Sequence, residues 1–144
     1  PPAARYQEYS LDRTAGLLAA RFPGRHVWMV RPSRYHEGIY ACFDNFVLTA
    51  DTFGRPDGGP TTVVRGVLHA ALLLEAAMAA VPGVPPPAAG IALMGFSKGS
   101  IVLDCMLTEL AMMRGMPPNR GVEAARRLLA ATRYLHWVDG MGHP

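Results

Sequence analysis

Charge is the first property that this chain has little of. Only 17% of its 144 residues are charged, the net charge is +3, and Lys98 is the single lysine. The arginines are scattered, without a basic run and without a stripe interleaved with aromatic residues. Nucleic-acid binding needs positive charge gathered on one face of a domain. We therefore expect no nucleic-acid partner.

Paired cysteines and paired metal ligands are also missing. Cys42 and Cys105 lie far apart and form no C-x-x-C pair, so we expect two buried thiols rather than a disulfide or a redox motif. A zinc site needs ligands at short fixed spacings. The histidines have no such spacing; they are His26, His36, His69, His136 and His143. We expect no metal and no cofactor.

No apolar run is long enough to predict a membrane span. The most apolar segment, 61–81, has a helical pattern, but Arg65, His69 and Glu75 interrupt it and leave a core shorter than a bilayer needs. We expect it to be a buried helix that covers a sheet. With half of the residues hydrophobic, the chain has enough apolar side chains for one core.

The two ends predict a piece of a longer protein. The chain starts at Pro1 without an initiating methionine, and it stops soon after a predicted strand at 134–138. We therefore expect residues 1–144 to form a single partial domain, truncated at both ends. A targeting peptide would lie outside this chain, so nothing about location follows from the ends.

Helices and strands are expected to alternate along the chain. The first helix is expected to begin after Ser10, a plausible N-cap, and to end at Pro23-Gly24. The expected order is helix 10–22, strand 26–30, helix 61–81, strand 91–94, helix 98–113, helix 121–131 and strand 134–138. Residues 33–37 are expected to form a polar loop. The segment 40–47 fits either a strand or a loop. This order predicts an α/β fold with a parallel sheet and helices on both faces.

The pentapeptide Gly95-Phe96-Ser97-Lys98-Gly99 matches G-x-S-x-G between a predicted strand and a predicted helix. In that context it predicts a nucleophile elbow, a strained turn that presents the serine Oγ to a base. The glycines are expected where crowded backbones leave no room for a side chain. The backbone N–H of Lys98 would face a developing oxyanion. The alternative is an ordinary strand-to-helix turn.

Candidate partners of Ser97 are expected at the carboxyl ends of the strands, where ligands bind in parallel sheets. Asp139 follows a strand and suits the orienting acid, although an Asp-Gly pair is also a plain turn. His143 is the only histidine after it, and the short spacing favours a turn residue or a substrate contact over the base. Asp44 and Asn45 either shape the rim of the site or serve packing and capping. His136 is expected in the core.

Several stretches resemble one protein family, and they run in order over nearly the whole chain. They are Tyr9-Ser10-Leu11, Arg21-Phe22-Pro23, Val27-Trp28-Met29-Val30, Cys42-Phe43-Asp44-Asn45-Phe46-Val47, Gly95-Phe96-Ser97-Lys98-Gly99 and Tyr134-Leu135-His136-Trp137-Val138-Asp139-Gly140. The family consists of uncharacterised mitochondrial proteins with an α/β-hydrolase-like domain, known in humans by a chromosome-2 open-reading-frame label. The resemblance implies a partial three-layer α/β-hydrolase-like fold, a mitochondrial location and Ser97 as nucleophile.

Two functions follow as hypotheses. The first is a serine hydrolase that acts on an ester or thioester, with either a small molecule or a lipid-like ester as substrate. The second is a non-catalytic hydrolase-fold protein that binds a ligand or a protein partner and keeps the turn for packing, because fold does not fix function. A histidine within reach of Ser97 would discriminate between them. This chain by itself is expected to be inactive, because it lacks a credible base.

Overall fold

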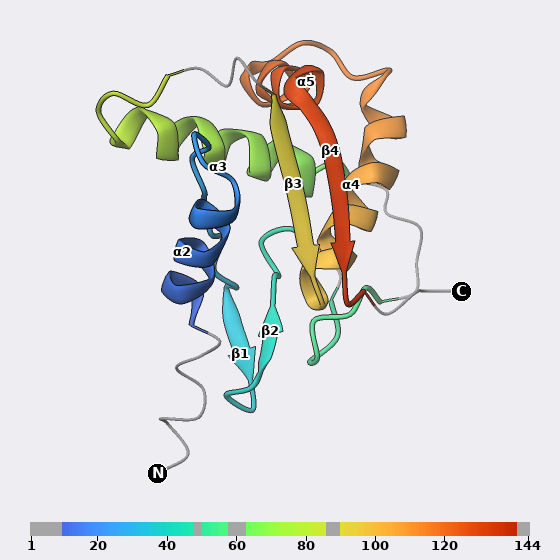
Figure 1. The fold of residues 1–144 in the computed structure, drawn as a ribbon. Helices are drawn as coiled ribbons and strands as arrows, with labels where there is room; N and C mark the ends of the chain where they lie inside the picture. Colours follow the sequence, from blue (N-terminus) through green and yellow to red (C-terminus); the bar gives the residue numbers. More distant parts are fainter. Residues whose placement is uncertain (1–9, 48–49, 58–62, 86–89, 141–144) are drawn as a thin grey trace. The chain divides into compact units, whose positions relative to one another are not determined.

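The computed structural model describes residues 10–47, 50–57, 63–85 and 90–140 (Figure 1). The chain divides into two compact units, Pro1–Arg31 and Pro32–Pro144. The first unit contains helix α2, Leu11–Arg21, and the Ser10 side chain accepts a hydrogen bond from the N–H of Arg13 at its start. The predicted helix, with its N-cap and its end before Pro23, is therefore confirmed.

The predicted strand over 26–30 is wrong. This segment has no regular secondary structure, and its Trp28 and Val30 side chains are 37% and 45% exposed. A strand exists only where a neighbouring strand pairs with its backbone groups, and no such pairing with 26–30 occurs among the described residues. A short apolar run can predict burial but cannot supply that partner.

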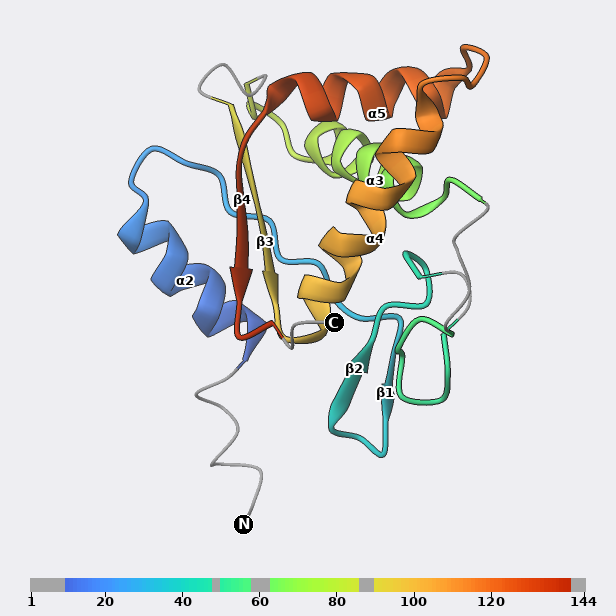
Figure 2. The ribbon, with the colours of Figure 1, turned by 90° about the vertical axis from the view of Figure 1, so that its right-hand side faces the viewer.

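The second unit is built on two parallel strands, β3 (Ile91–Phe96) and β4 (Thr132–Val138). Helices α4 (Lys98–Met113) and α5 (Arg120–Ala131) connect them. The register sets Phe96 beside Val138, so both strands end at the same edge of the sheet (Figures 1 and 2). The predicted parallel arrangement is confirmed for this pair, and each strand is two residues longer than predicted.

Helix α4 covers one face of the β3–β4 pair (Figure 2). Ile91 and Leu93 pack on that side against the hydrophobic core. On the opposite face Phe96 and Tyr134 are 64% and 60% exposed. His136 also lies exposed on this face and stacks on Tyr134, so its expected place in the core is wrong. Within this unit the fold is mixed α/β, with helices on one side of the pair.

A β-hairpin precedes these elements in the second unit. Strands β1 (Arg34–His36) and β2 (Tyr40–Cys42) are antiparallel, and Glu37 and Gly38 both have a positive φ at the turn, 52° and 70°. Two central residues with positive φ are typical of a tight hairpin turn that matches the twist of the strands. The predicted polar loop over 33–37 is therefore wrong, and 40–47 is a strand followed by a turn.

The core lies where helices α3 (Gly66–Ala80), α4 and α5 pack together. Buried apolar side chains of these three helices include Val67, Ala71, Ile101, Leu103, Met106, Met113, Val122, Ala124, Ala125 and Leu128. The predicted helix over 61–81 is confirmed from Gly66, but residues 63–65 are not helical, and 61–62 lie outside the described residues. Among the described residues, no helix is long and apolar enough to span a membrane.

A buried carboxylate starts helix α3. Glu109 of α4 is 1% exposed, and its two oxygens accept hydrogen bonds from the N–H groups of Gly66 and Val67 at 2.9 and 2.8 Å. Arg65, at the N-cap, makes no capping bond with its side chain. A negative charge at a helix N-terminus satisfies free N–H groups and interacts favourably with the helix dipole. Glu109 thus joins α3 to α4 across more than 40 positions of sequence.

Replacing Glu109 should therefore destabilise the second unit. We expect Glu109→Ala to lower the free energy of unfolding by about 3 kcal/mol, since it leaves buried N–H groups without an acceptor. Denaturant unfolding of the full-length protein measures the loss. Glu123→Ala is the control: its carboxylate pairs with Arg126 on the surface, and the expected loss is below about 1 kcal/mol. Equal losses for the two variants would contradict the capping role.

Candidate active site

Ser97 occupies the turn between β3 and α4 with a strained backbone. Its φ is 50° and its ψ is −113°, and it is one of the few described residues other than glycine with a positive φ. Such a conformation costs a non-glycine residue on the order of 1–3 kcal/mol and persists only where the surrounding structure enforces it. The sharp turn expected from the sequence is present, and Ser97 is half-buried at its apex.

Three hydrogen bonds hold this turn. The Ser97 N–H donates to the carbonyl of Val138 on β4 at 2.9 Å, and the Ser100 N–H donates to the Ser97 carbonyl at 2.9 Å. The hydroxyl of Ser100, which is 2% exposed, donates to the Gly95 carbonyl at 3.0 Å. The turn is therefore fixed to the neighbouring strand on one side and to the first turn of α4 on the other.

The two glycines of the pentapeptide have different environments. A Cβ at Gly95 would collide with the carbonyl group of Gly99 and lie 2.7 Å from the backbone nitrogen of Ser100. A Cβ at Gly99 would meet no described atom within 4 Å. The expectation that crowding requires glycine is thus confirmed for Gly95 and wrong for Gly99.

Asp139 lies next to Ser97 at the same edge of the sheet. It follows β4 directly, as Ser97 follows β3, and the last paired residues are Phe96 and Val138. Neighbouring strands are about 4.8 Å apart, so the two turns are adjacent. Asp139 also has a φ of 50°, and it is exposed to solvent. The structure therefore brings together the predicted nucleophile and the predicted acid.

The structure does not assign a base. The Ser97 side chain makes no capping hydrogen bond at the start of α4. His36 packs edge-on against Phe53, and His69 against Phe46, with ring centroids 4.6 and 4.9 Å apart. His143, the histidine that follows Asp139, lies outside the described residues.

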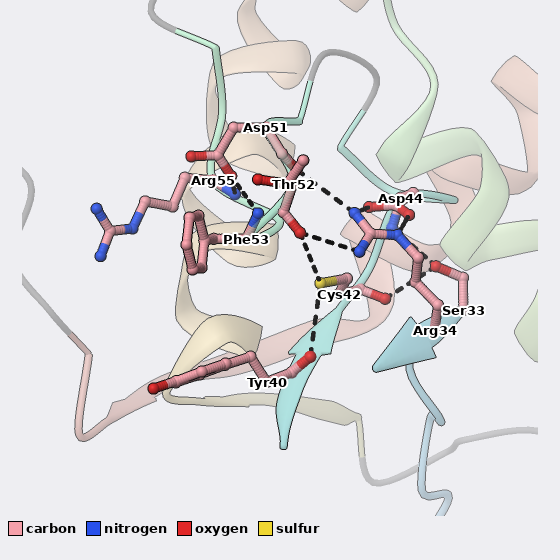
Figure 3. Close-up of polar contacts among 9 residues, drawn as sticks. All are labelled: Ser33, Arg34, Tyr40, Cys42, Asp44, Asp51, Thr52, Phe53 and Arg55. Atoms are coloured by element: carbon pink, nitrogen blue, oxygen red, sulfur yellow. Dashed lines mark hydrogen bonds and ion pairs between the residues drawn. The ribbon is translucent and has the colours of Figure 1, made fainter. Parts of the chain in front are cut away.

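Arg34 holds the hairpin and the following loop together (Figure 3). Its guanidinium forms an ion pair with Asp44 at 2.6 Å and donates to the carbonyl oxygens of Thr52 and Asp51. The hydrogen bond to Asp44 is the main cause that raises the pKa of Arg34. Asp44 thus pairs with Arg34, and Asn45 is exposed in the adjoining turn; a role for either residue at the rim of the site stays a prediction.

The positive charge of Lys98, the residue after Ser97, contributes to the pKa of Asp51 in this loop. The pKa of Asp51 is lowered first by the N–H of Arg55 and then by the N–H of Phe53, and the positive charge of Lys98 adds to that effect. The backbone N–H of Lys98 belongs to the first turn of α4, where N–H groups have no partner within the helix.

Both cysteines are free thiols, and the predicted burial is confirmed for Cys42 and wrong for Cys105. Cys42 is fully buried, whereas Cys105 is only partly buried, and burial raises the pKa of the Cys105 thiol. A protonated thiol is a poor nucleophile, so Cys105 is unsuited to that role. Throughout the described part of the chain, no three potential metal ligands lie together.

Comparison with known sequences identifies the family. A sequence model of the C2orf69 family matches residues 1–83, which is more than half of the chain. The chain belongs to the C2orf69 family. The match ends before Gly95, so membership in the C2orf69 family does not by itself give Ser97 a role.

Relatives from vertebrates align with the whole chain. A zebrafish (Danio rerio) protein named mitochondrial protein C2orf69 homolog is 33% identical over 100% of this chain and 43% of its own length. The human protein named mitochondrial protein C2orf69 is 25% identical over 99% of this chain and 48% of its own length. These names confirm the expected mitochondrial location. The chain spans about half the length of these relatives, and no solved structure matches it.

Gly95 and Gly99 differ in the space available for a side chain, and this difference allows a direct test of the turn. Gly95→Ala should lower the free energy of unfolding by about 2 kcal/mol or more, because the new methyl group collides with backbone that cannot move aside. Gly99→Ala should leave it unchanged or slightly higher, since alanine favours the helix. Thermal unfolding of the two variants decides, and an equal loss from both would contradict the described packing.

Proposed function

We propose that this chain is the central part of an α/β-hydrolase-like domain, and that the protein is a serine hydrolase with Ser97 as its nucleophile. The observation that carries the proposal is the strained backbone of Ser97, φ 50° and ψ −113°, at the end of a parallel strand and immediately before a helix. Strain of this kind concentrates at functional sites, and a strand-turn-helix context is what the G-x-S-x-G motif requires.

The reaction would be transfer of an acyl group through Ser97. Its Oγ attacks the carbonyl carbon of an ester or thioester and gives its proton to a histidine outside the described residues. The N–H of Lys98 and the N-terminus of α4 stabilise the oxyanion. The histidine then protonates the leaving alcohol or thiol, and water attacks the acyl-enzyme to release the acid.

Asp139 would orient that histidine. An acid in this role accepts a hydrogen bond from the imidazole and stabilises its charged form without itself gaining the proton. Its position after the strand next to that of Ser97 supports this role. The chain order, serine before acid, also agrees with the α/β-hydrolase pattern.

The substrate would carry an apolar group. The residues just before Ser97 and Asp139 are Phe96 and Val138, whose side chains are 64% and 39% exposed. Exposed apolar side chains beside a polar edge favour a ligand with a hydrophobic part. We therefore place lipid-like esters and thioesters first among candidate substrates.

Labelling with a fluorophosphonate tests the nucleophile. The full-length protein should react at Ser97, with fluoride as leaving group, and Ser97→Ala should not label although it folds. Asp139→Asn should label on the order of 10²-fold or more slowly, because the base loses its orienting acid. Intact-protein mass spectrometry against time gives both results.

A folded full-length protein that does not label would overturn the hydrolase proposal. It would favour the second hypothesis, a hydrolase-fold protein that binds a ligand or partner. Labelling that persists in Ser97→Ala would move the nucleophile elsewhere.

A further inference from the structure

We propose that Ser100 is a positioning residue that sets the placement of Ser97 relative to Asp139. The inference rests on the proposed function. It concerns a residue that the sequence does not single out, since a small polar residue one position after the second glycine reads as an ordinary helix residue.

The Ser100 side chain lies close to both of the segments that lead to the candidate catalytic groups. It donates to the Gly95 carbonyl at 3.0 Å, two residues before Ser97. A Cβ placed on Gly140, next to Asp139, would lie 3.0 Å from the Ser100 Oγ and 3.1 Å from its Cβ. One buried side chain therefore lies against the Ser97 turn and the Asp139 turn together.

Ser100 differs from an ordinary hydroxyl residue on a helix. Serine and threonine inside helices commonly bond to a carbonyl of the preceding helical turn. Thr108 of α4 does so, donating to the Asp104 carbonyl at 3.1 Å on the exposed surface. Ser100 instead donates out of its helix to the last part of β3. Its hydrogen bond thus joins two elements rather than supporting one.

For catalysis, the contacts of Ser100 would help to fix the distance between the Ser97 turn and the Asp139-Gly140 turn. Losing the hydroxyl would remove one hydrogen bond that places the Gly95 carbonyl and would open space beside Gly140, while the pairing of β3 with β4 remains. Misplacing a catalytic group by about 1 Å can cost on the order of 10²-fold in rate. We therefore expect the chemical step to slow in variants that change this contact, whereas the amount of folded protein changes little.

The test compares fluorophosphonate kinetics of variants of the full-length protein. Ser100→Ala removes the hydroxyl, and Gly140→Ala leaves the hydroxyl in place but pushes the Asp139 turn away from it. Both should lower the maximal inactivation rate constant, about tenfold or more for Ser100→Ala, at an unchanged probe concentration for half-maximal rate. The final labelled fraction should stay at the wild-type value. Thr108→Ala, which removes a hydroxyl from the same helix, should match the wild type.

The outcomes separate this inference from the proposed function. If the wild type labels and both variants react with its rate constant, Ser100 has no positioning role. If the variants lose only labelled fraction, in proportion to unfolded protein, its role is structural and the inference is wrong. A folded wild type that does not label contradicts the proposed function itself, and the positioning role fails with it.

Discussion

The hydrogen bond from the Ser97 N–H to the Val138 carbonyl is the interaction on which the rest of the site depends. A strained serine backbone costs about 1–3 kcal/mol, while one hydrogen bond contributes about 1 kcal/mol net. A single bond is therefore insufficient, and the Ser100 hydrogen bond to Gly95 acts beside it. The strain at Ser97 and the pairing of β3 with β4 are thus parts of one arrangement.

Helix α4 gives this arrangement its rigidity. Its first turn contacts β3 through Ser100, and Asp104, one helical turn further on, accepts a hydrogen bond from the Trp137 indole of β4 at 2.9 Å. Further along, buried Glu109 binds the N-terminus of α3. The helix that follows Ser97 is therefore attached to both strands and to the neighbouring helix, so the turn cannot relax without disturbing the core.

Local signals predicted local structure well and tertiary relations poorly. The cap at Ser10 and the glycine-flanked turn at Ser97 could be read from the sequence because their causes lie within a few residues. The strand expected at 26–30 has no pairing partner among the described residues, and the sequence of the segment itself cannot show that a partner is missing. The cap of α3 by Glu109, the position of His136 and the hydrogen bond of Ser100 depend on residues far away in sequence or on a neighbouring strand.

The most direct measurement of the strain compares two variants that both lack the Ser97 hydroxyl. Glycine adopts a positive φ without cost, whereas alanine retains the strain of the native backbone. Unfolding of Ser97→Gly and Ser97→Ala should therefore show the glycine variant to be more stable by about 1 kcal/mol. An alanine variant that is equally or more stable would contradict the strained turn, and with it the main support for Ser97 as a nucleophile.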